Sequence, residues 1–191
     1  MYAVPPPKAV SAPRTPAEVR KAAAVLWSGG TRYRVTDPTS GRSVRLDVAS
    51  NGVRQRLRLQ TPRLVIWLGG SSKSPTPTFV CVQIPPARPS CDPPAATKTT
   101  AQEAILVATR PLLQYAQLIA PGTLADERVQ VTTEAGYPVG CLQGKSRSGL
   151  GHVRLCTTRD GLLTEVDYKG ARIQAISVKT AVTSSDLAPP A

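Results

Sequence analysis

The chain has 191 residues, a length typical of one domain, and 41% of them are hydrophobic and 19% charged. It contains no run of about 18 uncharged apolar residues, which excludes a membrane-spanning helix, and its single histidine excludes a multi-histidine metal site. A net charge of +12 predicts affinity for polyanions: nucleic acid, anionic lipid or an anionic cell-wall polymer.

The beginning of the chain predicts a tether and then a short helix. Residues 1–15 are rich in proline and alanine and predict a flexible tether. Thr15, Pro16 and Glu18 match a helix N-terminus with a capping box, so a helix is expected over residues 16–27. We expect one domain over residues 16–183 and a frayed tail over residues 184–191.

From residue 31, apolar and polar residues alternate with the two-residue period of half-buried strands. Asn51-Gly52 predicts a tight hairpin, and folding about it places Leu46 opposite Leu57. The same register places Arg45 opposite Arg58, on a second face rich in arginine. Two more strands are expected, over residues 64–68 and 79–83, with a polar loop between them.

A long apolar segment, residues 101–120, predicts a helix that is buried on most sides. Thr100 and Glu103 match a capping box at its start. Proline cannot donate a backbone hydrogen bond inside a helix, so Pro111 predicts a kink or a break.

The last third predicts a second set of strands, over residues 128–133, 137–143, 151–157, 162–168 and 171–179. Hairpins about Asp160-Gly161 and Lys169-Gly170 would place Val166 opposite both Leu155 and Ile173. In this register the apolar residues Ile176 and Val178 fall on the polar face of the sheet. This predicts either a β-bulge in that strand or a strand that is covered on both of its faces. The expected fold class is α+β: a large curled antiparallel sheet, or half-barrel, around a buried, proline-broken helix, with a short N-terminal helix.

Four cysteines allow three disulfide pairings, and their separations favour Cys81 with Cys91 and Cys141 with Cys156. Cys141 and Cys156 are placed symmetrically about the loop 145–150, as a cross-strand pair would be. The alternative is four unpaired buried thiols. Disulfides would indicate an oxidising compartment, and the first residues lack an apolar signal core, so a leader would have been removed.

Little in the sequence predicts catalysis. His152 is the only histidine, it begins a predicted strand, and no nucleophile motif accompanies it. The sequence around Ser146 misses the spacing of a nucleophile elbow and is typical of a hairpin loop. We therefore expect no enzyme activity, no cofactor and no metal site, and a hydrolase is the least favoured alternative.

One candidate site is a stripe of arginines on the polar face of neighbouring strands. It consists of Arg32, Arg34, Arg45, Arg54, Arg56 and Arg58. It is either a solvated outer face or a surface that docks on an anionic membrane or cell-wall polymer. Nucleic acid is not expected as a partner, because only 4% of the residues are aromatic and none of them is predicted within this stripe on the polar face.

The second candidate site is the apolar hollow of the curled sheet. A helix that fits loosely in it would leave a cavity for an acyl chain, whereas a tightly fitting helix would leave a packed core. The expected lining is Val44, Leu46, Leu57, Leu59, Ile105, Leu106, Leu112, Leu113, Val153, Leu155 and Val166.

The order of elements resembles the bacterial lipoprotein-carrier (LolA-like) fold, and more closely the actinobacterial envelope lipoproteins that share it. The matching segments are residues 79–81 with Cys91, residues 140–141, residues 155–163 (LCTTRDGLL) and residues 185–190 (SDLAPP). The resemblance implies an extracytoplasmic, non-enzymatic protein that carries a lipid or a lipoprotein acyl chain. We therefore interpret the chain as a monomeric carrier of this kind. The alternative is a sensor or protein-interaction domain on the same scaffold, in which the hollow is packed.

Overall fold

The structure, a computed structural model, describes residues 11–25, 27–36, 43–71, 74–169 and 171–191. Within these ranges, the side chains of residues 75–76, 106–107 and 109–118 are outside the description. Residues 1–10 of the predicted tether also lie outside the described residues.

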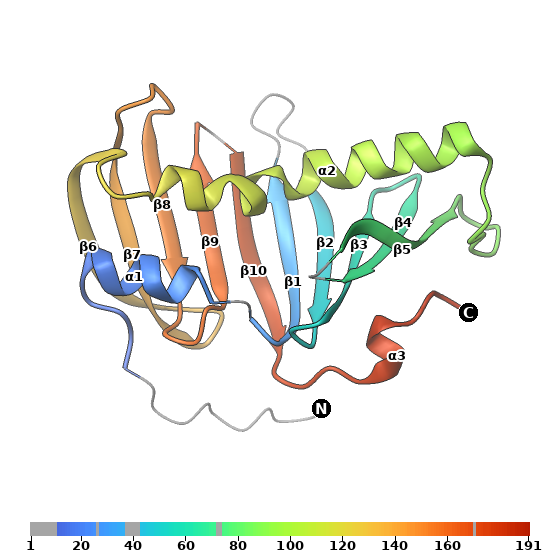
Figure 1. Cartoon of the computed structure of the whole chain (residues 1–191), viewed down its shortest axis with the longest axis horizontal. Helices are drawn as coiled ribbons and strands as arrows, with labels where there is room; N and C mark the ends of the chain where they lie inside the picture. Colours follow the sequence, from blue (N-terminus) through green and yellow to red (C-terminus); the bar gives the residue numbers. More distant parts are fainter. Residues whose placement is uncertain (1–10, 26, 37–42, 72–73, 170) are drawn as a thin grey trace.

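Ten strands form one open antiparallel sheet that curls around two helices (Figure 1). The first five strands are β1 (Gly29–Thr36), β2 (Ser43–Ser50), β3 (Arg54–Gln60), β4 (Val65–Ser71) and β5 (Ser74–Gln83). The last five are β6 (Leu124–Glu134), β7 (Tyr137–Ser146), β8 (His152–Thr157), β9 (Leu163–Tyr168) and β10 (Ala171–Lys179). Each group is a meander, and the two join where β1 pairs with β10, so β5 and β6 are the outer edges. The predicted α+β class with a large curled antiparallel sheet is confirmed.

The longest helix, α2 (Ala95–Leu118), connects the two outer edges across the concave face of the sheet (Figure 1). Its 24 residues span about 36 Å, and nine steps of about 4.8 Å between ten strands span about 43 Å. One continuous helix therefore suits this connection, and the predicted break at Pro111 is not confirmed, since α2 continues through that residue. The predicted N-terminus of this helix was wrong, because α2 begins at Ala95 and Thr100 lies inside it. The Thr100 hydroxyl donates a hydrogen bond to the Ala96 carbonyl at 3.0 Å and does not cap the helix.

The N-terminal helix α1 (Pro16–Ala23) begins with the predicted capping box. The Glu18 N–H donates to Thr15 Oγ1 at 3.2 Å, and the Thr15 N–H donates to Glu18 Oε2 at 3.1 Å. The segment before α1 lies against β7, where a Cβ on Gly140 would be 2.1 Å from the Pro13 carbonyl oxygen. Glycine at position 140 thus allows residues 11–15 to lie close to the sheet.

The hairpin between β2 and β3 has a different register from the predicted one. Leu46 lies opposite Leu59 instead of Leu57, a shift of two residues. The loop is longer than a two-residue turn because Asn51 Oδ1 accepts hydrogen bonds from the N–H groups of Val53 at 3.1 Å and Arg54 at 2.7 Å. An even shift keeps every side chain on its predicted face.

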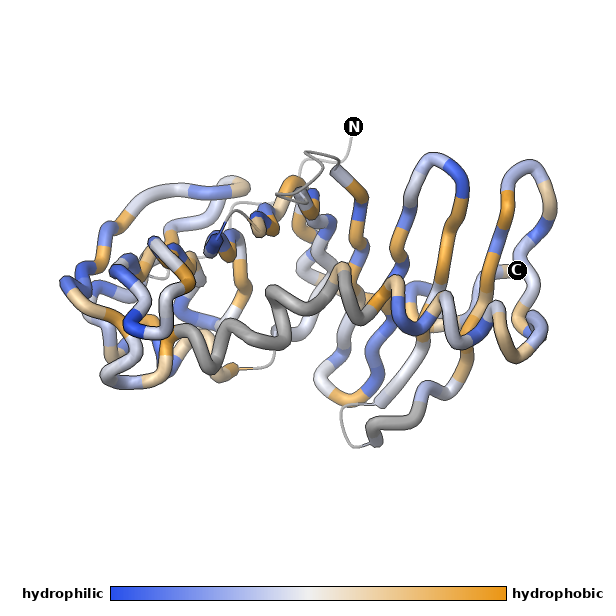
Figure 2. Tube along the Cα trace, turned by 90° about the horizontal axis from the view of Figure 1, so that it is seen from above, coloured by the Kyte–Doolittle hydropathy of each residue, from blue (hydrophilic) through white to orange (hydrophobic). Residues whose placement is uncertain are grey.

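The registers of the second meander are confirmed. Leu155 pairs with Val166, and Val166 pairs with Ile173. The predicted β-bulge is also present: the β1–β10 register shifts between Arg32 and Tyr33 and leaves Ile176 without a partner in the ladder. The shift returns Val178 to the concave face opposite Thr31. Figure 2 shows the resulting alternation of hydrophobic and hydrophilic residues along the strands.

The last helix, α3 (Ser184–Leu187), lies within the predicted frayed tail. It follows β10 and packs beside β2 and β3 (Figure 1). Its position matters for the arginine stripe, because α3 lies on the face that carries those side chains.

Candidate functional site

The predicted lining of the hollow lies on the concave face, but it is divided among three hydrophobic clusters. Leu57, Leu59 and Ile105 belong to a cluster between α2 and strands β3 to β5. Leu46 belongs to a central cluster, and Val44 contacts both. Leu106, Leu112 and Leu113 fall in α2 with side chains outside the described residues.

The third cluster shows that a helix other than the predicted one packs against part of the concave face. Val153, Leu155 and Val166 pack against Val19 and Ala23 of α1, not against Ile105 of α2. These three side chains are at most 1% exposed. The half of the concave face formed by β7 to β9 is therefore packed core, to which α1 contributes together with Ile119, the residue after α2.

A pocket of about 810 Å³ lies where β2 begins and the chain turns from β3 to β4. It is lined by Ser43, Val44, Thr61, Pro62 and Arg63. Of the predicted lining residues whose side chains the structure describes, Val44 alone lines this pocket. Val44 and Pro62 give it apolar surface, and its volume is within the range of about 300–1,000 Å³ typical of small-molecule sites.

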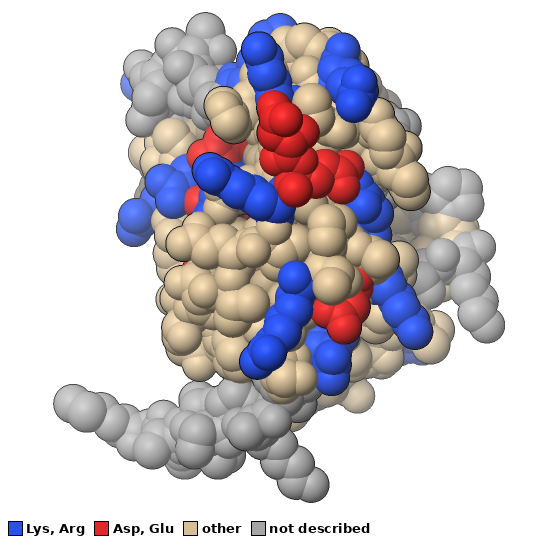
Figure 3. All heavy atoms as spheres, turned by 90° about the vertical axis from the view of Figure 1, so that its left-hand side faces the viewer, with Lys and Arg blue, Asp and Glu red and all other residues tan. Residues whose placement is uncertain are grey.

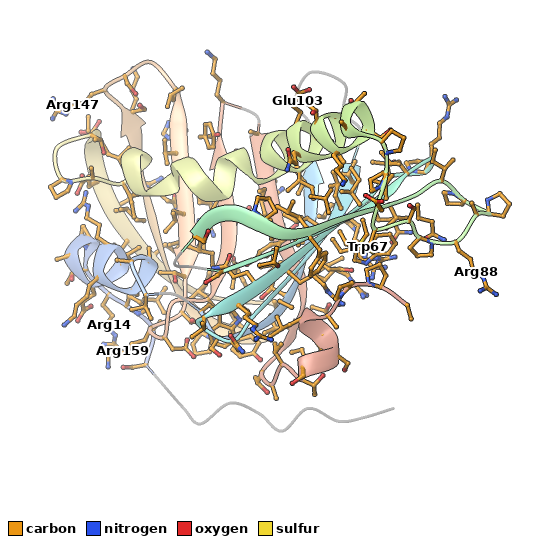
Figure 4. The ribbon with its side chains drawn as sticks, turned by 45° about the vertical axis from the view of Figure 1, so that its right-hand side comes forward. Arg14, Trp67, Arg88, Glu103, Arg147 and Arg159 are labelled. Atoms are coloured by element: carbon orange, nitrogen blue, oxygen red, sulfur yellow. A yellow bond between two sulfur atoms is a disulfide. The ribbon has the colours of Figure 1, made fainter. Side chains whose placement is uncertain are left out.

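The convex face of β1 to β3 carries the six arginines, but three of them bind one carboxylate. Asp47 accepts from Arg32 Nε at 2.9 Å, Arg45 Nη2 at 2.8 Å and Arg58 Nη1 at 3.1 Å. Burial opposes ionisation of Asp47, but the hydrogen bonds from Arg45, Arg32 and Arg58 outweigh it and lower the pKa of Asp47. The three arginines are therefore partly neutralised. Arg58 also lies over the ring of Trp67, 5.5 Å from the ring centre; Figure 4 labels Trp67.

Arg56 holds the C-terminal segment. Its Nη1 donates to the carbonyl oxygens of Ser185 at 3.3 Å and Ala188 at 3.0 Å. Burial there lowers the pKa of the Arg56 guanidinium. Lys179 adds an ion pair with Asp186 at 2.6 Å, and this hydrogen bond, with others from Thr183, lowers the pKa of Asp186.

Arg34 and Arg54 complete the stripe and differ from the other four. Both are exposed, and neither forms an ion pair with a residue that the structure describes. Arg34 lies directly opposite Arg45 across the β1–β2 ladder, so like charges adjoin. By contrast, the β6 end of the molecule carries charges of both signs (Figure 3). Arg20 forms an ion pair with Glu127, and Arg159 forms one with Glu18.

A buried carboxylate on β9 was not predicted. The Glu165 side chain is 4% exposed and accepts hydrogen bonds from Arg154 Nε at 2.7 Å and Arg172 Nε at 2.8 Å. Burial opposes its ionisation, but the two arginines outweigh it and lower the pKa of Glu165. Arg154 also binds Glu134 at 2.9 Å. This ion-pair network ties four strands, β6, β8, β9 and β10, together across the convex face, which is a structural role.

Both predicted disulfides, Cys81–Cys91 and Cys141–Cys156, are confirmed. Cys141 and Cys156 lie opposite each other in the β7–β8 ladder, as the symmetry of their loop predicted. Glu134 lies near both sulfurs, a grouping that could suggest a metal site. Because both sulfurs are in a disulfide, no thiolate is available there to bind a metal.

Comparison with known proteins gave no family model and no curated protein that matches this chain. Among the described residues, no helix is both long enough and apolar enough to cross a membrane. The fold and disulfides define an α+β protein with one large antiparallel sheet, and two disulfides fit an extracytoplasmic location.

Proposed function

We propose that this protein is an extracytoplasmic, non-enzymatic protein of the cell envelope that binds a lipid or acyl chain on the concave side of its sheet. The observation that carries the proposal is the pocket of about 810 Å³ beside Val44. The resemblance to lipoprotein carriers supports the same function.

The sequence predicted a cavity along the hollow of the sheet, whereas the pocket lies at the beginning of β2 beside Val44. The proposed acyl-binding site is therefore restricted to this end of the concave side. The concave face over β7 to β9 is packed against α1, so an acyl chain would not displace that core. Val44 is half-buried, and it contacts the cluster that contains Ile105 of α2 and Leu59 of β3. An acyl chain in the pocket would thus extend a hydrophobic surface that already exists, and each methylene buried contributes about 0.8 kcal/mol.

The test is a titration of the purified monomer with a fluorescent fatty acid, together with native mass spectrometry of lipid extracted with the protein. Val44→Trp should fill the pocket and weaken binding at least tenfold. Val131→Trp is the matched control, because Val131 is 51% exposed on β6 at the other edge of the sheet. Binding by wild type and Val131→Trp but not by Val44→Trp supports the proposal; no binding by wild type contradicts it.

If wild type binds no lipid and Val44→Trp is destabilised, the alternative is favoured: a sensor or protein-interaction domain with a packed hollow. The specific observation in its favour is the complete burial of Leu46 and Leu155, both 0% exposed. Overpacking such a core costs about 1–3 kcal/mol.

We also propose that the convex face docks on an anionic membrane surface or cell-wall polymer. On β1 to β3, six arginines against Asp47 give this part of the convex face an excess of positive charge, and Arg34 and Arg54 are its exposed, unpaired members among the described residues. The proposed roles use opposite faces of one sheet, so they can be tested separately.

A further inference from the structure

The pocket beside Val44 has five lining residues in the described part of the chain, and one of them, Arg63, has a charged side chain. Arg63 is exposed, and among the described residues its guanidinium has no ion-pair or hydrogen-bond partner. Most arginines of the neighbouring strands differ, since Arg45 and Arg58 bind Asp47 and Arg56 binds the C-terminal segment.

The turn that carries Arg63 is held by its own hydrogen bonds. The Thr61 N–H donates to the Leu64 carbonyl at 2.9 Å. Thr61 Oγ1 accepts from the Leu64 N–H at 3.0 Å and donates to the Leu64 carbonyl at 3.1 Å. A turn fixed in this way keeps the Cα of Arg63 at the pocket without using its guanidinium.

The other polar side chains that are described in the pocket lining, those of Thr61 and Ser43, are already engaged. Thr61 is used within the turn, and the Ser43 hydroxyl lies 3.1 Å from the Thr36 hydroxyl in a hydrogen bond. Among the lining residues that the structure describes, the apolar surfaces of Val44 and Pro62 are therefore combined with one uncommitted cation, Arg63. A guanidinium binds carboxylate and phosphate oxygens in a bidentate manner, so the chemistry favours an anionic amphiphile over a neutral lipid.

We propose that Arg63 binds the anionic head group of the acyl ligand while the hydrocarbon chain occupies the pocket; this rests on the proposed function. The head group is a carboxylate or a monoester phosphate, two groups with the same oxygen chemistry. Arg63 is a specificity-determining residue in this proposal, since the apolar surface alone would accept charged and neutral chains alike.

The experiment measures displacement of the fluorescent fatty acid from wild type, Arg63→Gln and Arg88→Gln by three probes of equal chain length: palmitate, methyl palmitate and palmitoyl lysophosphatidic acid. Arg88 is a control that also loses one positive charge, and it lies at the tip of the loop closed by Cys81–Cys91 (Figure 4). Thermal melting of each variant checks that it folds.

Wild type and Arg88→Gln should bind palmitate or the lysophosphatidic acid about tenfold more tightly than the methyl ester, as a charged hydrogen bond would provide. Arg63→Gln should lose that preference and keep its affinity for the ester. The anion with the larger loss identifies the source of the head group. Equal affinity of Arg63→Gln and wild type for both anions would overturn the role of Arg63 while leaving acyl binding intact. Failure of wild type to bind any probe would overturn the proposed function as well.

Discussion

Asp47 of β2 and Arg58 of β3 lie directly opposite each other, with Arg58 Nη1 3.1 Å from Asp47 Oδ2. The predicted hairpin would have paired Arg58 with Arg45, a repulsive contact. The same predicted register paired Asp47 with Arg56. The two-residue shift pairs Asp47 with Arg58 instead and moves Arg45 opposite Gln60, which removes the repulsive contact. It also aligns Arg32, Asp47, Arg58 and Trp67 in one row across four strands, so a single carboxylate organises the middle of the arginine-rich face.

Asp47→Asn should therefore destabilise the fold. The substitution removes the charge that three arginines share and leaves them to repel one another. Hydrogen bonds to charged groups contribute about 1.5–3 kcal/mol each, but these are partly exposed, so we expect a total loss of about 1–3 kcal/mol at pH 7. Urea unfolding at low and high salt measures it.

Asp92→Asn is the control for the same chemical change. Asp92 is 98% exposed and forms an ion pair with Lys98 at 3.1 Å, so its replacement should cost less than about 0.5 kcal/mol. Equal effects of the two substitutions would show that Asp47 does not organise the face.

The buried Glu165 should give the fold a component of acid sensitivity. Its folded-state pKa is lowered, so its stabilising contribution is complete above the unfolded-state pKa of about 4.3 and is lost as pH falls through the lower folded-state pKa. Glu165→Gln should cost about 2 kcal/mol at neutral pH. The difference between wild type and variant should shrink below about pH 4.

The comparison must account for the groups that face Glu165. These are Arg154, Arg172, Glu134 and Asp167, and burial raises the pKa of Asp167. They are present in both proteins, so most of their titration cancels in the difference between the two unfolding curves. Glu103→Gln is the matched control, since Glu103 is exposed on α2 (Figure 4). A difference that is constant from pH 7 to pH 3 would contradict the prediction.

Short-range patterns predicted most of the sheet. In the second meander, two-residue alternation and glycine turns gave correct registers, because each loop is short and leaves one choice of pairing. The same reasoning failed at Asn51, because the Asn51 side chain stabilises a loop longer than two residues. The Asn-Gly dipeptide alone does not distinguish this loop from a two-residue turn. The correct register of β8 and β9 also places Glu165 diagonal to Arg154, a signal that a search of diagonal neighbours would have found.

The candidate site was less predictable, for a physical reason. Whether a helix fills a hollow depends on contacts between segments far apart in the sequence, and hydrophobic periodicity carries no information about them. Nothing in the pattern of Val19 and Ala23 indicates that α1 would cover Val153. The turn at Arg63 contributes to the pocket through its place at the end of two strands, which follows only from the assembled sheet.

The two disulfides should differ in their accessibility to reductant. Cys91 is exposed, whereas Cys141 and Cys156 are both 0% exposed. Thiol–disulfide exchange requires access to a sulfur atom. In the folded protein, mild reduction followed by alkylation and peptide mapping should therefore label Cys81 and Cys91 first.

Reduction in urea provides the control. Unfolding exposes all four sulfurs, so both cysteine pairs should then be labelled at the same rate. Equal labelling of both pairs in the folded protein would contradict the prediction. Opening the Cys141–Cys156 bond, whose cysteines are 15 residues apart, should cost about 3 kcal/mol if loop entropy dominates.

Binding to anionic vesicles tests the convex face, and the structure determines which arginines to replace. Arg56 holds the C-terminal segment and Arg58 binds Asp47, so changing them would disturb the fold as well as the charge. Arg34→Gln with Arg54→Gln removes two exposed charges that lack ion pairs with described residues. Each basic residue near an anionic membrane contributes about 1 kcal/mol, so the double variant should bind vesicles containing phosphatidylglycerol at least tenfold more weakly at low salt.

The matched control is Arg88→Gln with Arg147→Gln, which removes the same charge from two exposed loops outside this face (Figure 4). It should bind like wild type. Raising the salt concentration should weaken binding of wild type, because screening acts over about 8–10 Å at ordinary ionic strength. If both double variants lose the same affinity, binding depends on net charge alone and not on the arginine-rich face. If wild type binds neutral and anionic vesicles equally, the convex face is a solvated outer surface, and the membrane-docking proposal is wrong.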